Sequence, residues 1–316
     1  MRDDPRDQLD AEGPVTPDDA EIEAWEGMAR VLTATGHFRV LRRFRPRARY
    51  AAADGVPKRT ALFVDVETTG LDTAADSIIE FAAVPFTYCP ATGTIYDVHP
   101  AYVALEDPGR PIPPAVVRLT GIADETVAGR RVDDGRVAAL VAGANLVLAH
   151  NAAFDRRMCE RRFPAFAHVP WACTHADVPW AEHGCRGTKL DYLLVARCAE
   201  YFEGHRAADD CHAAIHVLAT PFACGMQPLK LLLDAARAPT VRVWAPDTPF
   251  AIKDALHARR YRWHPGDARR KKAWYRDGSA DDAEAECRWL VAHAYRGRNG
   301  WSLERLTALE RYSVRA

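Results

Sequence analysis

The sequence predicts an α/β protein whose central part forms a mixed β-sheet flanked by helices. Two observations support this class. A short apolar run, Ala61 to Val64, begins a series of three strand-like segments that is followed by alternating helical and strand patterns. A second, shorter set of strand and helix patterns begins after Met226. A chain of 316 residues accommodates two domains on the usual prior of roughly 150 residues each. We therefore expect a larger α/β domain and a small α+β module.

The N-terminal part divides into a tail and a helical, basic segment. Residues 1–20 are polar and rich in Pro and Asp, and we expect a disordered tail there. In residues 21–58, apolar side chains recur at steps of three and four, which predicts an amphipathic helix over about residues 20–41. These side chains are Ile22, Trp25, Met28, Ala29 and Leu32. Gly55 and Pro57 are typical of a linker over residues 51–57.

The main domain is expected over residues 59–222. After the first strand, residues 77–87 and 94–105 form two further strand patterns, and the turn residues 90–93 between them predict a hairpin. Helical patterns with interruptions fill residues 113–143, and a fourth strand is expected at 145–149. Further helices are expected at 152–162, 188–198 and 206–220. Strands followed by alternating helices and strands give a mixed sheet with helical layers.

The C-terminal module, residues 238–316, combines basic and aromatic side chains. Strands are expected at 240–244 and 273–275, and helices at 251–259 and 282–296. Five aromatic residues fall in or near its basic block: Trp244, Tyr261, Trp263, Trp274 and Tyr275. Arginine and lysine interleaved with aromatic side chains are typical of single-strand nucleic-acid contacts. The alternative is that a module of this size needs its tryptophans, Trp263 and Trp274 in particular, for a core.

Charge is unevenly distributed along a chain whose net charge is only −1. Residues 37–59 and 259–276 each hold eight Lys or Arg against one Asp. Such blocks attract a polyanion locally, although each is equally compatible with ordinary solvated surface. No apolar run approaches the roughly 20 residues that span a bilayer, and the N-terminus does not resemble a secretory signal. We expect a cytoplasmic protein with no membrane partner.

Eight cysteines are scattered without a Cys-x-x-Cys pair, which indicates reduced thiols rather than disulfides. One cluster leaves a zinc site open as an alternative: Cys173, His175, His183 and Cys185. Its spacing matches no common zinc pattern.

Acidic side chains occur near the ends of predicted elements. Asp65 and Glu67 lie two apart at the end of the first strand, so they point to the same face. Adjacent carboxylates repel, and a divalent cation relieves that repulsion. Oxygen ligands favour Mg²⁺ or Mn²⁺. Asp155 opens the helix after the fourth strand, and Asp210 opens the last helix of the domain. A pair of solvated acids at a strand end is the alternative for Asp65 and Glu67 alone.

His205 precedes Asp210 by five residues, which corresponds to about 140° around a helix. The two side chains can meet only if His205 lies in the loop before the helix, and Gly204 favours that loop. A surface or capping role is the alternative for this histidine. Asp209 competes with Asp210 for the acidic role, but it would face elsewhere on the helix.

Three blocks together resemble the histidine branch (DEDDh) of the DEDD exonuclease superfamily, which includes ribonuclease T and the epsilon subunit of DNA polymerase III. They are Asp65-x-Glu67-Thr68-Thr69-Gly70, His150-Asn151-x-x-Phe154-Asp155 and His205-x-x-x-x-Asp210. The tyrosine branch would need Tyr where Arg206 stands. The resemblance covers residues 59–222 and implies a ribonuclease H-like fold. It also implies 3′→5′ exonuclease activity that releases nucleoside 5′-monophosphates.

The same resemblance implies roles for individual residues. Asp65, Glu67, Asp155 and Asp210 would hold two divalent cations, Mg²⁺ or Mn²⁺, and His205 would be the general base. The residues implied to contact the terminal nucleotide are Thr68, Leu71, His150, Asn151 and Phe154. For Leu71 and Phe154, core packing is an equal alternative.

The expected partner is a single-stranded 3′ end, and a polymerase is a further partner that the resemblance suggests. DNA is favoured over RNA, with a proofreading or repair role. RNA 3′-end trimming is the nearest alternative, because the five catalytic groups contact no 2′-hydroxyl in a way that the sequence reveals. A catalytically silent nucleic-acid-binding or polymerase-associated module is a second alternative.

Overall fold

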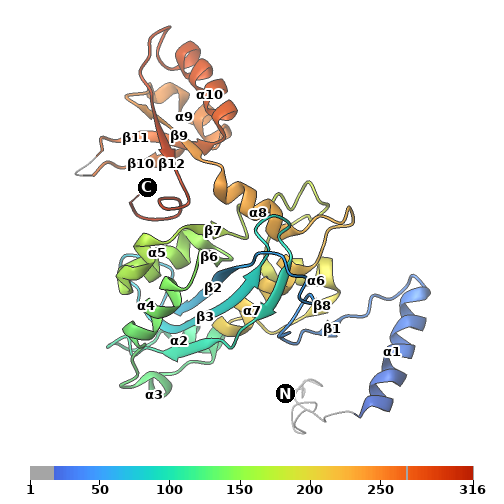
Figure 1. The fold of residues 1–316 in the computed structure, drawn as a ribbon. Coiled ribbons are helices and arrows are strands. Elements are labelled where there is room, and N and C mark those ends of the chain that lie inside the picture. Colours follow the sequence, from blue (N-terminus) through green and yellow to red (C-terminus); the bar gives the residue numbers. More distant parts are fainter. Residues whose placement is uncertain (1–17, 268–269, 316) are drawn as a thin grey trace, which may run out of the picture.

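The computed structural model describes residues 18–267 and 270–315 (Figure 1). The prediction of a disordered tail falls mostly on residues 1–17, outside the described part. The larger domain is built on a mixed sheet with the strand order β4-β3-β2-β6-β7, and β5 also pairs with β3. These strands are β2 (Arg59–Thr68), β3 (Ile78–Tyr88), β4 (Ile95–Val98), β5 (Tyr102–Leu105), β6 (Leu146–Ala149) and β7 (Trp171–Cys173). Strand β2 runs antiparallel to β3 and parallel to β6, so the predicted mixed α/β sheet is confirmed.

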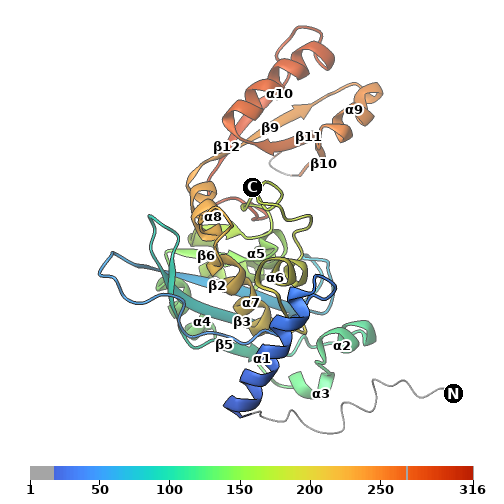
Figure 2. The ribbon, with the colours of Figure 1, turned by 90° about the vertical axis from the view of Figure 1, so that its right-hand side faces the viewer.

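Helices cover both faces of this sheet (Figures 1 and 2). On one face lie α6 (Leu190–Cys198), α7 (Ala207–Ala219) and α8 (Pro228–Arg237). On the other lie α4 (Asp134–Ala142), α5 (Ala152–Arg162) and the 3-10 helix η2 (Pro164–His168). Two short helices, α2 (Pro114–Thr120) and α3 (Asp124–Val127), follow β5. The predicted helices at 152–162, 188–198 and 206–220 are each present within two residues.

Alternation along β2 divides the core into two layers. Ala61 and Phe63 are buried with α6, α7 and α8, whereas Leu62 and Val64 are buried on the α5 side. Because side chains on a strand alternate between faces, the next residues of the first row, Asp65 and Glu67, point toward α7. The fold therefore directs the two acids to the face where α7 begins.

The N-terminal helix is shorter than predicted. Helix α1 (Asp19–Ala34) begins at a capping box formed by Asp18 and Glu21, and the chain then turns at Gly36 with a φ of 70°. The expected continuation to residue 41 is wrong, because this left-handed turn ends the helix. Strand β1 (Arg42–Arg43) then pairs with β8 (Glu200–Tyr201) in parallel. Much of the apolar face of α1 stays exposed, including Trp25 and Met28.

The C-terminal module contains a four-stranded antiparallel sheet with the order β10-β11-β9-β12. Its elements are β9 (Thr240–Pro246), η3 (Phe250–Ile252), α9 (Lys253–Ala258), β10 (Arg262–His264), β11 (Ala273–Gly278), α10 (Ala280–His293) and β12 (Ser302–Leu306). One face of the sheet packs against α9 and α10. Trp274 lies in that core, whereas Trp263 is half exposed. Packing in the module's core, the alternative to nucleic-acid contact for these tryptophans, therefore holds for Trp274 and only partly for Trp263.

The last residues of the chain leave this module and return to the larger domain. The backbone carbonyl of Ala308 accepts from the Trp171 amide of β7, and the Tyr312 hydroxyl donates to Asp177 at 2.6 Å. Arg156 of α5 is fully buried, and its guanidinium donates to the carbonyls of Ala308, Leu309 and Arg311. We call residues 307–315 the C-terminal strap. Together with α8, the strap attaches the module to the larger domain at two points (Figure 1).

Within the described residues, no helix combines the length and the apolar character that crossing a membrane requires.

Candidate active site

Three acidic side chains converge where β2 meets the start of α7. Carboxylate oxygens of Asp65, Glu67 and Asp210 all lie within 4.8 Å of one another, and each residue is partly accessible. This is the only metal-competent group of three or more His, Cys, Asp or Glu side chains among the described residues. Asp65 and Glu67 are adjacent members of the α7-facing row of β2, and Asp210 lies in the first turn of α7. The structure thus brings together three of the acids that the sequence singled out.

Asp155 reaches the same place from the other side of the sheet. It lies in the first turn of α5, directly after the loop that leaves β6, and its side chain is buried. The charge of Asp155 acts on Asp65, and the charge of Asp210 acts on Asp155. Because β2 and β6 are parallel neighbours, their carboxyl-terminal ends lie at one edge of the sheet, which explains how a helix on the far face supplies the fourth acid.

His205 occupies the loop before α7, as its spacing predicts. Its φ of 73° lies in the left-handed region that a residue with a side chain adopts only at a cost of about 1–3 kcal/mol. Its backbone amide donates to Oδ2 of Asp210 at 2.9 Å, which supports this conformation. The side chain is exposed, and no described residue bonds to the ring. Asp209 is exposed and lies outside the acidic group, whereas Asp210 belongs to it.

The acidic cluster raises the pKa of every member. Burial is the main cause at each position, and repulsion from neighbouring carboxylates adds to it. The pKa of Glu67 rises to about 8, that of Asp155 to about 7 and that of Asp210 to about 6. The pKa of Asp65 rises well above its ordinary range. Raised pKa values of this kind mean that the cluster holds protons more readily than ordinary carboxylates do, and a bound cation would favour their release.

A fifth carboxylate, Glu80, escaped the sequence analysis. It lies on β3 directly opposite Glu67, so both side chains project from the same face. Glu80 is buried, and its carboxylate accepts from the Arg206 guanidinium at 2.8 Å and from the Ala207 amide at 2.9 Å. It therefore holds the first residues of α7 against the sheet. An acid within an otherwise apolar buried strand, Ile78-Ile79-Glu80-Phe81, is the signal that could have identified it.

The turn after β2 is compact and leaves one apolar side chain exposed to solvent. The Thr68 hydroxyl donates to the Gly70 carbonyl at 2.6 Å, and the Thr69 hydroxyl donates to Asp76 at 2.9 Å. A Cβ on Gly70 would lie 2.5 Å from Oδ2 of Asp76, so a side chain there would displace this carboxylate from Thr69 and Arg110. Leu71 is 88% exposed, which excludes the core-packing alternative for this residue.

The other residues expected to contact a nucleotide lie around the start of α5. Asn151 is exposed and precedes the helix, whereas Phe154 is half-buried and packs against the core on that face. His150 places both ring nitrogens on internal partners: Nδ1 lies 2.8 Å from the Thr174 hydroxyl and Nε2 lies 2.9 Å from the Thr188 carbonyl. Since a carbonyl only accepts, Nε2 carries the proton. Burial lowers the pKa of His150 to about 4, so the ring is neutral.

The zinc alternative is not supported. Cys173, His175, His183 and Cys185 form no metal-competent group, although the structure describes all four. The Cys173 thiol donates to the His150 carbonyl, and the His183 ring stacks on Phe222 at 3.8 Å. These side chains have structural partners instead.

Comparison with known proteins identifies the domain that carries the site. The family model described as "Exonuclease" matches residues 62–218. A DNA polymerase III of PolC type from Bacillus subtilis (strain 168) is 31% identical over 199 residues, which are 60% of this chain and 13% of the relative. The corresponding protein of Listeria welshimeri is 37% identical over 103 residues, 32% of this chain and 7% of the relative. The chain thus spans only a small part of these curated relatives.

Solved structures with a similar arrangement include two exonucleases. The zinc-bound form of Escherichia coli exonuclease I with single-stranded DNA superimposes with a TM-score of 0.48 at 17% identity, covering 76% of this chain and 69% of that one. Exonuclease X with 5′-overhanging duplex DNA gives a TM-score of 0.38 at 25% identity, covering 54% and 99%.

Proposed function

Because the chain belongs to the DEDDh 3′→5′ exonuclease superfamily, we propose that its acidic cluster uses divalent cations to hydrolyse DNA from the 3′ end. The products would be nucleoside 5′-monophosphates. Residues 62–218 form an exonuclease domain, and we propose the 3′→5′ direction, the metal, the preference for DNA and the individual catalytic residues from the site.

The observation that carries the proposal is the convergence of four carboxylates from β2, α5 and α7. The donor atoms are oxygens, which Mg²⁺ and Mn²⁺ prefer. The crowding of Asp65, Glu67 and Asp210 within 4.8 Å fits the binding of positive charge. Burial and mutual repulsion raise the pKa of these groups, so the cluster is short of a counter-charge that a divalent cation supplies.

In this proposal each residue has a distinct part. Asp65, Glu67, Asp155 and Asp210 would hold the cations. When bound, such ions lower the pKa of water and stabilise the charge that develops on a phosphodiester. His205, exposed in the loop beside Asp210, would accept the proton of the attacking water.

The terminal nucleotide would lie between the turn after β2 and the start of α5. Exposed Leu71 supports a base contact from one side, and exposed Asn151 supports a polar contact from the other. Thr68 and Phe154 are proposed to shape the same space. His150 would contribute by holding the loops at Thr174 and Thr188 in place, since its ring nitrogens bind there.

DNA is favoured as the substrate because the curated relatives are DNA polymerases of the PolC type. Those names also support an association with a polymerase and a role in proofreading or repair. RNA trimming is the second candidate, because none of the five catalytic groups identifies a 2′-hydroxyl.

The test is a comparison of 5′-labelled DNA and RNA oligonucleotides of the same sequence, each with Mg²⁺, Mn²⁺ or EDTA. We expect stepwise shortening of DNA from the 3′ end, release of 5′-monophosphates and no reaction in EDTA. Faster shortening of RNA would reassign the substrate. Failure to shorten either polymer with either metal would favour the silent binding module.

A further inference from the structure

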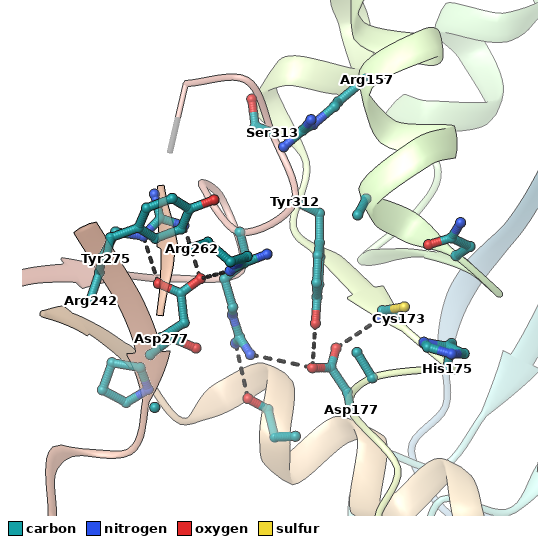
Figure 3. A pocket seen from close by; sticks show the side chains of 18 of the residues that line it. Arg157, Cys173, His175, Asp177, Arg242, Arg262, Tyr275, Asp277, Tyr312 and Ser313 are labelled. Carbon is teal, nitrogen blue, oxygen red and sulfur yellow. Dashed lines mark hydrogen bonds and ion pairs between the residues drawn. The ribbon is translucent and has the colours of Figure 1, made fainter. Parts of the chain in front are cut away.

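A cleft of about 950 Å³ separates the larger domain from the C-terminal module (Figure 3). One wall consists of the start of α5 and the loop after β7, with Asn151, Arg157 and His175. The opposite wall is the face of the module's sheet that α9 and α10 do not cover, with Arg262 and Tyr275. The C-terminal strap also lines the cleft.

The cleft begins at the sheet edge that carries the acidic cluster. Strands β2, β6 and β7 are parallel, so the segments that follow them emerge at the same edge. The carboxylates lie at the end of β2, Asn151 follows β6, and His175 follows β7. A chain leaving the catalytic centre along this edge therefore passes Asn151 and then enters the cleft.

The charge of the cleft is positive. Four arginines line it against two aspartates. Asp277 receives both Arg242, at 2.6 Å, and Arg262, at 2.9 Å, so one carboxylate is shared by two guanidinium groups. Arg157 is exposed, and no described residue forms a hydrogen bond or ion pair with its side chain. Guanidinium groups available on both walls are suited to the phosphates of a polynucleotide.

Aromatic rings lie beside these charges. Tyr275 stands directly opposite Arg262 in the sheet and has the guanidinium groups of Arg242 and Arg262 at 4.7 and 4.8 Å from its ring centre. Trp263 follows Arg262 on the edge strand β10 and pairs with Trp274, so its side chain projects to the other face of the sheet, where its ring centre lies 5.3 Å from that of Trp274. Partly exposed aromatic rings next to arginines are typical of protein surfaces on which the bases of single-stranded nucleic acids stack.

The cleft is preformed because the module is attached twice. Helix α8 leads into β9, and the strap returns from β12 to β7 and α5. Arg311 reinforces the closure, since its guanidinium donates to the carbonyls of Ala235 and Ala236 at the end of α8. Both walls are thus held in place before a ligand arrives, which reduces the entropy cost of binding.

We propose that this cleft binds the single-stranded polynucleotide on the 5′ side of the nucleotide that is cleaved. Arg157 and Arg262 contact its phosphates from opposite walls, and Tyr275 contacts a base. The inference rests on the proposed function and adds to it a binding path outside the catalytic centre. It requires that substrates long enough to enter the cleft are bound more tightly than short ones.

The experiment compares a thymidine trinucleotide with a 20-nucleotide oligothymidylate, using the full-length protein. The test variant is Arg157→Ala/Arg262→Ala, which leaves Asp277 paired with Arg242. The matched control is Arg136→Ala/Arg288→Ala, two exposed arginines outside the cleft, one on α4 and one on α10. Both double variants lose the same charge, so a general electrostatic effect would appear in both.

We expect the KM of the test variant for the 20-mer to rise about tenfold, and its dependence on salt to weaken by about one phosphate contact for each arginine. The KM for the trinucleotide should stay within about twofold of wild type. A 20-nucleotide oligouridylate run in parallel assigns the cleft to DNA, to RNA or to the backbone shared by both.

Two results would overturn the inference while the proposed function stands: a 20-mer KM equal to that of the control variant, or an equal loss on both substrate lengths. A wild-type protein that cleaves neither substrate would instead overturn the proposed function itself, and the cleft proposal with it.

Discussion

At the scale of single residues, the site places acidic side chains close together and partly out of water, where their charged form is disfavoured. Four carboxylates are gathered in a partly buried space, where burial first and repulsion from neighbouring carboxylates second raise their pKa values. Glu80 adds a fifth carboxylate, which accepts from Arg206 and the Ala207 amide and whose charge also raises the pKa of Asp65, Glu67 and Asp210. Such an arrangement costs stability unless a cation or protons supply positive charge.

The pH dependence of stability tests whether the gathered carboxylates destabilise the fold when no cation is bound. The pKa of Asp155 rises to about 7 in the folded protein, against about 3.9 in an unfolded chain. A raised pKa stabilises the fold below about pH 4, and that contribution is lost as pH rises toward about 7. The test measures the Tm of Asp155→Asn minus the Tm of wild type, in EDTA, at pH 5 and at pH 8. This difference should be larger at pH 8 by about 5 °C or more. A difference in Tm that is the same at both pH values would contradict the assignment.

Glu80 is expected to position the start of α7. In Glu80→Gln, an amide oxygen can still accept from the Ala207 amide, but the charge that binds Arg206 is lost. We expect a stability loss of about 1–3 kcal/mol and a several-fold rise in the Mg²⁺ concentration needed for half-maximal rate, because Asp210 and His205 depend on this helix end. Glu284→Gln, at an exposed ion pair with Arg288, is the control. An unchanged Mg²⁺ requirement with reduced stability would leave Glu80 a purely structural residue.

At the scale of elements, the sequence predicted those parts whose signals are local. The apolar run before Asp65 identified β2, and the pattern around Asp155 identified α5 within its observed bounds. Strand β7 was missed because three buried residues give too short a pattern. The strap was missed because its hydrogen bonds to α5 and to the loop after β7 join residues more than 130 positions apart, a pairing that no local periodicity encodes.

The strap is expected to stabilise α5 directly. Truncation after residue 306 would leave the buried Arg156 guanidinium without three carbonyl acceptors, and Glu160 without Ser313 and Arg315. Arg156 keeps its ion pair with Glu160, but a buried donor without an acceptor costs about 1–3 kcal/mol. Urea unfolding should show a loss of that order, and a smaller loss for truncation after residue 313. Equal stability of the two truncated chains would show that these contacts contribute little.

At the scale of the whole molecule, two folded parts face each other across one sheet edge (Figure 2). The larger domain carries the acidic cluster, and the module places Arg242, Arg262 and Tyr275 on its side of the cleft. The sequence predicted the acidic residues of the larger domain and the basic and aromatic residues of the C-terminal module. It could not indicate the cleft, because the cleft depends on how the strap and α8 orient the module.

The central claim is that the carboxylates from β2, α5 and α7 together carry out hydrolysis with a divalent cation. Asp65→Ala measures it most directly, with labelled DNA, Mg²⁺ and circular dichroism of the same preparation. We expect a folded protein whose rate of 3′-end shortening is lower by about 10³-fold or more. A folded Asp65→Ala protein that shortens DNA as fast as wild type would contradict the account.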